Sequence, residues 1–411
     1  MGKLVLTYEK THNEMCRLVD RSTDYVFWFA FYLDFDYHTK LKRAILSALE
    51  RGVTVYISTS ELNPDKISYS HPNLIVKNNT RIDKNDDILY NAFIAMITQD
   101  SLPKRVNHMR FLYNGHELLL GGTNSCMRYN GNHTERTCEL DDDKFYWHDS
   151  GYLTCEYSNQ YHFFHEIFMR IDDASIRDLS VGDLVVSNKA QYEFILQNIR
   201  DAKREIYIEC QYFHTHPKHG NNQIASELAM RINRAVRNDD DFKITIIANS
   251  LNHDERKIHY AATCISLGCL CGFRKLCDCD DETFAKFVTC KMPSVSSHII
   301  IHQKCWIYDD TIALYTTGNL SDRSCYDTGD LEMGIIIRKN VAGFRETFES
   351  NLMKLPLFTF DFTLPKYNSG VFILDNVQQT VDIWCDGCDF VSPVMDVGAI
   401  LGFKASNFPP P

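Results

Sequence analysis

The stretch IHQKCWIYDDTIALYTTGN, residues 301–319, places charged and polar side chains inside a segment patterned as buried strands. Residues i and i+2 of a strand point to the same face, so His302 and Lys304 share one face. An imidazole can attack or transfer a proton near neutral pH, and an ammonium group beside it supplies a fixed positive charge. This pair suits a phosphoryl group, whose oxygens need their charge neutralised during in-line attack.

The alternative is a half-buried strand with a hydrogen-bonded histidine and a lysine that reaches the surface, and the pair alone favours that interpretation. The residues that follow change the balance. A second apolar strand and a tight turn would bring Thr317 and Asn319 back beside His302. Glu332 follows in a further strand, where a carboxylate could orient an imidazole. Together these residues predict a phosphate site.

The segment resembles the second HKD motif of the phospholipase D superfamily, His-x-Lys-x4-Asp followed by a small-small-x-Asn turn. The residues at the family spacing are His302, Lys304, Asp309, Thr316, Thr317, Gly318 and Asn319. The run NLSDRS, 319–324, and Glu332 are similar to eukaryotic and plant-type phospholipases D. IYIECQYF, 206–213, resembles the IYIENQYF of the same enzymes.

That family uses two such motifs, one in each half of the chain, so the resemblance implies an internal repeat. NHMRFLYNGHELLLGGTN, 107–124, contains His108 and Arg110, followed by two short strands and Asn124. His302 lies 194 residues after His108, which is close to half of the 411-residue chain.

The segment FYWHDSGYLTCEY, 145–157, resembles the strand that closes the first half in eukaryotic family members. Asp149 would then mirror Glu332.

The resemblance and the alternation of strands with helices predict an α/β fold. We expect two similar α-β-α halves, each a mixed sheet flanked by helices, packed as a pseudo-dimer around one shared active site. The predicted divisions are a first half with an altered motif, a second half with the intact motif, and an unassigned C-terminal extension. These divisions are residues 1–172, 173–355 and 356–411.

The first motif departs from the family pattern at two positions. Arg110 replaces the lysine, and Asn114 stands near the position of the aspartate with one residue fewer between them. Arginine can bind phosphate in a planar, bidentate way, with a reach different from that of lysine. We interpret the first half as altered but retaining its histidine, and a decaying half remains the alternative.

The resemblance implies that one of His108 and His302 attacks phosphorus and forms a phosphohistidine, while the other protonates the leaving oxygen. The intact second motif favours His302 as the nucleophile, although the sequence leaves this open. Arg110, Lys304, Asn124 and Asn319 are expected to hold the phosphoryl oxygens. Glu332 and Asp149 would orient the imidazoles, and Thr317 and Asp309 would support the site.

Composition favours a globular protein rather than a disordered or membrane-spanning one. Hydrophobic residues make up 44% of the chain, and no run of about 18 apolar residues exists. The N-terminal MGKLVLTYEK does not read as a secretory signal, so we expect a cytoplasmic protein that could contact a membrane surface. The net charge of −11 leans away from a nuclease, although a local basic groove can sit on an acidic protein.

The chain has 15 cysteines, which we interpret as reduced thiols. A less favoured alternative is a structural zinc site at Cys269, Cys271, Cys277 and Cys279, although this spacing is not that of a common zinc ribbon. The resemblance implies no metal and no cofactor for the chemistry.

Three functions are therefore compatible with the sequence. The first is a metal-independent phosphodiesterase acting on a phospholipid, and the second is a nuclease with the same histidines in a different groove. The third is an impaired family member that binds a membrane or a protein. A nuclease would lose affinity steeply as salt rises, and a binding module would be indifferent to His302→Asn.

Overall fold

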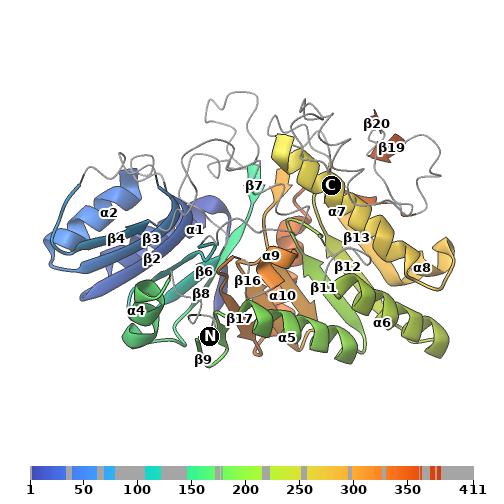
Figure 1. The fold of residues 1–411 in the computed structure, drawn as a ribbon, viewed down its shortest axis with the longest axis horizontal. Helices are drawn as coiled ribbons and strands as arrows, with labels where there is room; N and C mark the ends of the chain where they lie inside the picture. The colour runs from blue at the N-terminus through green and yellow to red at the C-terminus, as the bar shows by residue number, and fades with distance from the viewer. Residues whose placement is uncertain are drawn as a thin grey trace, which may run out of the picture.

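The computed structural model describes a set of segments that together carry both motif histidines. They are residues 2–33, 39–62, 69–78, 107–121, 146–171, 176, 179–214, 223–250, 257–294, 299–325, 330–360, 362, 371–374 and 377–380. Within them the strands form two large mixed sheets, which lie side by side with helices packed on them (Figure 1).

The first sheet has the strand order β1-β8-β6-β5-β2-β3-β4. Its strands are β1 (Lys3–Leu6), β2 (Tyr25–Leu33), β3 (Thr54–Leu62), β4 (Leu74–Asn78), β5 (Phe111–Tyr113), β6 (Leu118–Gly121) and β8 (Ser150–Thr154). β2, β3 and β4 run parallel, and the remaining pairs are antiparallel. The parallel part follows from the crossover through helix α2 (Thr39–Glu50), because parallel neighbours require such a connection.

The second sheet has the order β18-β13-β12-β11-β15-β16-β17-β10-β9. Its strands are β9 (Ser180–Val181), β10 (Leu184–Val185), β11 (Glu205–Glu209), β12 (Lys243–Ile247), β13 (Val288–Pro293), β15 (Cys305–Tyr308), β16 (Ile312–Thr316), β17 (Gly334–Ile337) and β18 (Leu357–Phe360). Without its two edge strands, β9 and β18, this sheet repeats the order of the first.

The repeated strand order confirms the predicted α/β fold of two similar halves. One boundary differs from the prediction. β18 lies beyond residue 355, yet it pairs with β13 and completes the edge of the second sheet. Residues 357–360 therefore belong structurally to the second half. A separate hairpin, β19 (Val371–Leu374) with β20 (Val377–Thr380), follows in the described part of the C-terminal region.

Helices cover both faces of the sheets. They are α1 (Tyr8–Asp20), α2, α4 (Tyr161–Met169), α5 (Asn188–Asp201), α6 (Ile224–Asn238), α7 (Lys257–Lys275), α8 (Asp281–Phe287), α9 (Asp322–Cys325) and α10 (Val341–Leu352). The amphipathic pattern of α6 explains its position, because buried Ile224, Leu228, Ile232 and Ala235 recur every three or four residues. None of the helices in the described segments has the length and hydropathy of a membrane span.

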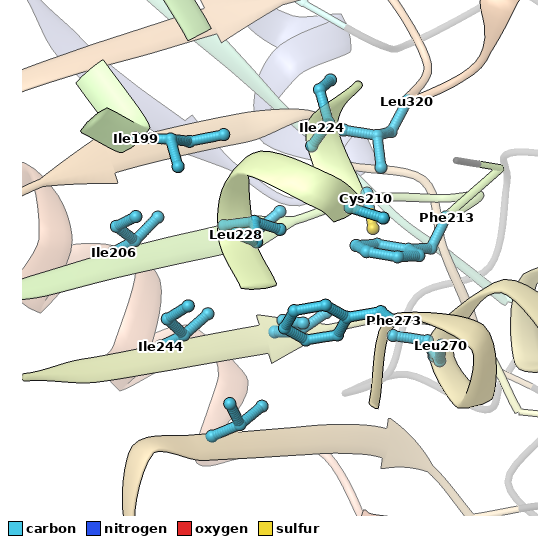
Figure 2. Packing of buried hydrophobic residues seen from close by; sticks show 14 of the residues in the cluster. Ile199, Ile206, Cys210, Phe213, Ile224, Leu228, Ile244, Leu270, Phe273 and Leu320 are labelled. Atoms are coloured by element: carbon cyan, nitrogen blue, oxygen red, sulfur yellow. The ribbon is translucent and has the colours of Figure 1, made fainter. Parts of the chain in front are cut away.

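Within the described segments, the core consists of three clusters. One joins α1 and α2 to the outer face of the first sheet. A second joins α5, α6 and α7 to the outer face of the second sheet, where Phe213, Leu228 and Phe273 meet (Figure 2). The third is continuous between the halves, because α4 and α10 pack with residues of both inner faces, such as Phe29 and Tyr315. This shared cluster holds the halves together beside the motif segments.

Among the described residues, two short backbone pairings cross between the halves. β14 (Ile299–Ile301) pairs in parallel with β7 (Tyr146–His148). Asn107 forms an isolated parallel bridge with Leu331. Each pairing ends immediately before a motif histidine, so the fold brings His108 and His302 to the junction of the halves.

Candidate active site

His302 is held by the first half. Its backbone N–H donates to the His148 carbonyl at 2.9 Å, which continues the β14–β7 pairing. Its Nδ1 lies 2.6 Å from Oδ2 of the next residue, Asp149, and both side chains are buried. The other carboxylate oxygen of Asp149 accepts the N–H of Ser150 at 2.9 Å. The parallel register thus places a carboxylate on Nδ1 of the imidazole.

His108 is held by the second half in the same manner. Its backbone N–H donates to the Leu331 carbonyl at 3.0 Å. Its Nδ1 lies 2.8 and 3.0 Å from the two oxygens of the next residue, Glu332. Thr317 donates its hydroxyl to Glu332 at 2.6 Å, and Ser324 donates at 2.8 Å. This carboxylate therefore has partners on both oxygens.

Each imidazole is thus paired with the carboxylate of the opposite half. The sequence predicted that Asp149 and Glu332 orient the two imidazoles, but it did not indicate that the pairs cross between the halves. The crossing follows from the two parallel backbone pairings. Each histidine directly follows one of the paired segments, and each carboxylate directly follows the segment paired with it. A site built in this way needs both halves.

Lys304 is buried, and its side chain contacts residues of its own half, the second. Its Nζ donates to the Gln211 side-chain oxygen at 3.1 Å and to the His302 carbonyl at 2.5 Å. Burial lowers the pKa of the Lys304 ammonium well below its usual value, and the nearby Arg110 lowers it further while Asp149 and Glu332 oppose the shift.

Arg110 is equally buried but binds differently. Its Nη2 lies 2.5 Å from Nε2 of His108. Its Nε and Nη1 have no hydrogen-bond partner within the described segments. Buried donors without partners are uncommon because they lose their hydration without compensation. Two N–H groups of the guanidinium, Nε and Nη1, are therefore available to bind an acceptor that the described residues do not supply.

The two carboxylates differ in ionisation. Burial raises the pKa of Asp149 to about 7, although Lys304 and Arg110 act against the shift. Burial would also raise the pKa of Glu332, but His108, Thr317 and Ser324 hold it below its ordinary value. Asp149 therefore carries a proton part of the time near neutral pH, whereas Glu332 is a carboxylate that accepts hydrogen bonds.

The tautomer of His108 follows from these contacts. An ionised Glu332 can only accept, so Nδ1 of His108 carries the proton. Arg110 can only donate, so Nε2 of His108 holds a lone pair. Burial and the neighbouring Arg110 both lower the pKa of His108, and Glu332 partly compensates. His108 is therefore neutral at neutral pH, with its basic nitrogen facing the guanidinium.

The other predicted site residues divide into two groups. Thr317 supports Glu332, and Asn319 lies nearby with its N–H donated to the Ser324 hydroxyl at 3.1 Å. The side-chain oxygen of Asn319 is buried with no hydrogen-bond partner within the described segments. Asn124 lies outside the described residues.

Asp309 and Asn114 lie at hairpin turns and contact neither histidine. Asp309 follows β15 and accepts the backbone N–H groups of residues 203–205 at 2.7–2.9 Å. Asn114 follows β5, accepts the N–H groups of His116 and Glu117, and donates to the Leu18 carbonyl. Asp309 therefore holds the backbone that leads into β11, and Asn114 holds the turn between β5 and β6. Both contacts are structural.

Sequence reasoning did not assign Gln211, Ser324 or Glu209 to the site. Glu209 is fully buried and accepts the Tyr207 hydroxyl at 2.9 Å, and burial raises its pKa to about 8. A signal was present, since Glu209 and Gln211 alternate on one face of the IYIECQYF segment. A buried strand seldom carries two long polar side chains on one face unless they have partners.

The four cysteines considered as zinc ligands lie on α7 or just after it. Cys269, Cys271 and Cys277 are buried in the outer cluster of the second half, and Cys279 packs against it. Across the described residues, no three His, Cys, Asp or Glu side chains are grouped to hold a metal ion. The Cys277 thiol donates to the Phe273 carbonyl at 3.6 Å.

Comparisons with known proteins show what the chain resembles in sequence and fold. Over 201 residues, 44% of this chain, it is 26% identical to phospholipase D A of Dictyostelium discoideum. Over 193 residues, 39% of the chain, it is 26% identical to a phospholipase D of Phytophthora infestans. The matched segments span only 16% and 11% of those two relatives. No family model matches the chain.

Among solved structures, phosphatidylserine synthase of Haemophilus influenzae Rd KW20 aligns with a TM-score of 0.59 and 13% identity, covering 88% of each chain. Polyphosphate kinase of Porphyromonas gingivalis aligns with a TM-score of 0.54 and 10% identity, covering 98% of this chain and 53% of that one. The chain resembles the phospholipase D superfamily in sequence and in fold. The phospholipase D-like fold accounts for the two sheets of repeated strand order.

Proposed function

We propose that the protein is a phospholipase D-like phosphodiesterase in which His108 and His302 act as a pair. One observation carries the proposal. Two buried imidazoles are each held at Nδ1 by a carboxylate of the opposite half, beside the buried cations Arg110 and Lys304. Groups arranged in this way suit attack on phosphorus, protonation of a leaving oxygen and neutralisation of phosphoryl charge.

We assign the nucleophile to His108, in contrast to the preference for His302 that the intact second motif suggested. His108 has its proton on Nδ1 and a lone pair on Nε2, as a nucleophile requires. His302 is paired with Asp149, whose pKa of about 7 lets this pair hold an extra proton near neutral pH. A proton-rich pair suits the general acid.

The reaction then balances in two steps. Nε2 of His108 forms a bond to phosphorus, the bond from phosphorus to the leaving oxygen breaks, and His302 gives that oxygen its proton. Water then gives a proton to His302 and attacks phosphorus, and the bond from phosphorus to Nε2 breaks. Arg110, Lys304, Asn319 and Asn124 are proposed to hold the phosphoryl oxygens.

A phospholipid is the proposed substrate. The names of the two curated relatives support a phospholipid diester, and the net charge of −11 is unfavourable for general nucleic-acid binding. We propose residues 1–172 and 173–355 as the two catalytic halves, with β18 added to the second. The region beyond remains without a proposed role.

The test uses a short-chain phosphatidylcholine carrying ³²P in its phosphate, beside ³²P-labelled single-stranded DNA. After an alkaline quench, we expect alkali-stable, acid-labile label on the protein from the lipid only, together with release of choline. Label from DNA only, with activity that falls steeply with salt, would identify a nuclease instead. Absence of label and turnover with both substrates would leave the binding module as the better interpretation.

Metal independence is a separate part of the proposal. Turnover of the lipid should be unchanged by a chelator such as EDTA, because the proposed steps use two imidazoles, two cations and water. A loss of turnover that an added divalent cation restores would contradict this part and leave the proposed roles of the histidines to be tested separately.

A further inference from the structure

Arg110 and Lys304 occupy matching positions two residues after the motif histidines, yet their contacts differ. Lys304 Nζ is bonded to Gln211 and to a backbone carbonyl. Arg110 Nη2 instead meets the reactive nitrogen of its own histidine, His108 Nε2. The lone pair that the proposed function needs for attack is therefore already occupied.

The neighbourhood of Arg110 explains this contact. Gln211, two residues beyond the end of the central strand β11, supplies an oxygen to Lys304. The register of β2 with β5 matches that of β11 with β15, so Phe31 stands in the first half where Gln211 stands in the second. The Phe31 ring lies edge-on to His108, with 5.3 Å between ring centroids, and offers no oxygen. Within the described segments, Nε2 of His108 is the acceptor that Arg110 Nη2 reaches.

Resting on the proposed function, we propose that Arg110 caps Nε2 of His108 until a phosphoryl oxygen of the substrate takes over the guanidinium. An anionic oxygen forms a stronger, charge-assisted bond than a neutral imidazole nitrogen does. When Nη2 turns to that oxygen, Nε or Nη1 can reach a second oxygen of the same group, since both donors are unpartnered within the described segments. Substrate binding then uncovers the nucleophile, and an empty site keeps it covered.

A lysine at position 110 would not reproduce this cap. Its ammonium has a single tetrahedral centre and no planar fork, so it cannot hold a phosphoryl oxygen and cover Nε2 in the same way. Arg110→Lys keeps the charge and removes the cap, which makes it the informative substitution. Lys304→Arg is the matched control, because it places a guanidinium beside the other histidine and leaves Arg110 in place.

The cap is tested without turnover, by two readouts of His108. The first is the Nε2 resonance in a two-bond ¹H–¹⁵N correlation spectrum of histidine-labelled protein, assigned with His108→Asn. The second is the rate at which diethyl pyrocarbonate modifies His108, followed by mass spectrometry. In Arg110→Lys we expect the Nε2 resonance to move toward that of an unbonded acceptor, and modification to become about tenfold faster. Inorganic phosphate added to the wild-type protein should move the resonance the same way.

Three results would overturn the cap: no change of His108 in Arg110→Lys, an equal change in Lys304→Arg, or a wild-type resonance that phosphate leaves unmoved. Turnover of bis(p-nitrophenyl) phosphate is measured on the same samples. Turnover without a cap would contradict this inference alone. A cap without turnover of this diester or of the lipid would contradict the proposed function and leave the contact as a structural feature.

Discussion

The two halves of the molecule share a strand order but not the contacts at their motifs. In the second half, Gln211, just beyond the central strand, accepts a hydrogen bond from the motif lysine, and the histidine faces a carboxylate whose pKa is raised to about 7. In the first half, a phenylalanine stands at the place of that glutamine, and the motif arginine meets its own histidine. The carboxylate that faces the first-half histidine, Glu332 of the second half, is ionised and has partners on both oxygens.

Under the proposed function, this difference corresponds to a division of roles between the two histidines rather than to decay of the first half. A decaying half would be expected to lose its buried polar contacts, because a buried group without partners is costly. Both ring nitrogens of His108 have partners, and Arg110 is buried beside them, while Nε and Nη1 of Arg110 have none within the described segments. Of the two departures from the family motif, Arg110 contacts the proposed nucleophile, whereas Asn114 contacts neither histidine.

Replacing either motif histidine should cause the largest loss of turnover, and a burst experiment should distinguish their roles. Each of His108→Asn and His302→Asn should lower phospholipid turnover by about 10⁴-fold, because each removes a group that acts on the reacting atoms. With bis(p-nitrophenyl) phosphate, whose leaving group needs no acid, His302→Asn should still release one equivalent of nitrophenol and accumulate phosphohistidine. His108→Asn should release none. A stopped-flow burst found only in His108→Asn would reverse the assignment.

The crossed carboxylates should give the next largest effect. Asp149→Asn and Glu332→Gln should each lower turnover by about 10²-fold or more, because each leaves an imidazole without the partner that fixes its tautomer. Only Glu332→Gln should also abolish the burst of nitrophenol, since Glu332 holds the nucleophile. If both variants retain the burst equally, the crossed pairs do not divide the two roles. Circular dichroism serves as the folding control.

Replacing Gln211 should matter more than replacing Phe31. Gln211→Leu removes the side-chain acceptor of a buried ammonium and should lower turnover about tenfold. Phe31→Leu keeps an apolar side chain beside His108 and should lower it only about twofold, by loss of the ring contact. Michaelis constants and turnover numbers of both variants, measured on the same lipid, test the difference. Equal losses would mean that the two positions are not functionally distinct.

The two carboxylates should have opposite effects on stability as pH changes. Folding raises the pKa of Asp149 from 3.8 to about 7, so the folded state holds a proton that the unfolded state releases between those values. The contribution of Asp149 to the free energy of unfolding is therefore present at low pH and is lost as pH rises from about 4 to about 7. Glu332, whose pKa is lowered, contributes above its ordinary value of 4.5, and this contribution is lost as pH falls.

Urea denaturation between those pH values measures the effect. Asp149→Asn should remove its part of the decline in stability with rising pH, and Glu332→Gln should not. An unchanged pH slope in Asp149→Asn would show that Asp149 does not hold the extra proton of the folded state.

The smallest effect on chemistry is expected at the turn residues. Asn114→Ala and Asp309→Ala should each lower the free energy of unfolding by about 2 kcal/mol, because backbone donors lose their side-chain acceptors. Turnover should stay within about threefold of the wild type, since neither side chain contacts a histidine. Asn114→Asp, which restores the family residue type, should not raise turnover. A large gain would show that this departure from the motif limits the chemistry.

The sequence, through its resemblance to a two-motif family, predicted the repeat, the α/β architecture and the two histidines and two carboxylates that lie at the junction of the halves. The alternation expected of a strand predicted that His302 and Lys304 share a face. Asp149 was predicted from the segment that resembles the closing strand of the first half, and Glu332 from its place after the second motif.

Tertiary structure decided which carboxylate serves which histidine, because that depends on two parallel pairings between segments more than 150 residues apart. It also decided that Arg110 faces His108 while Lys304 faces Gln211. Local sequence gives a strand its alternation, but the acceptor that a buried cation reaches is set by the neighbouring strand of the sheet. The state of each histidine is therefore a property of the assembled halves.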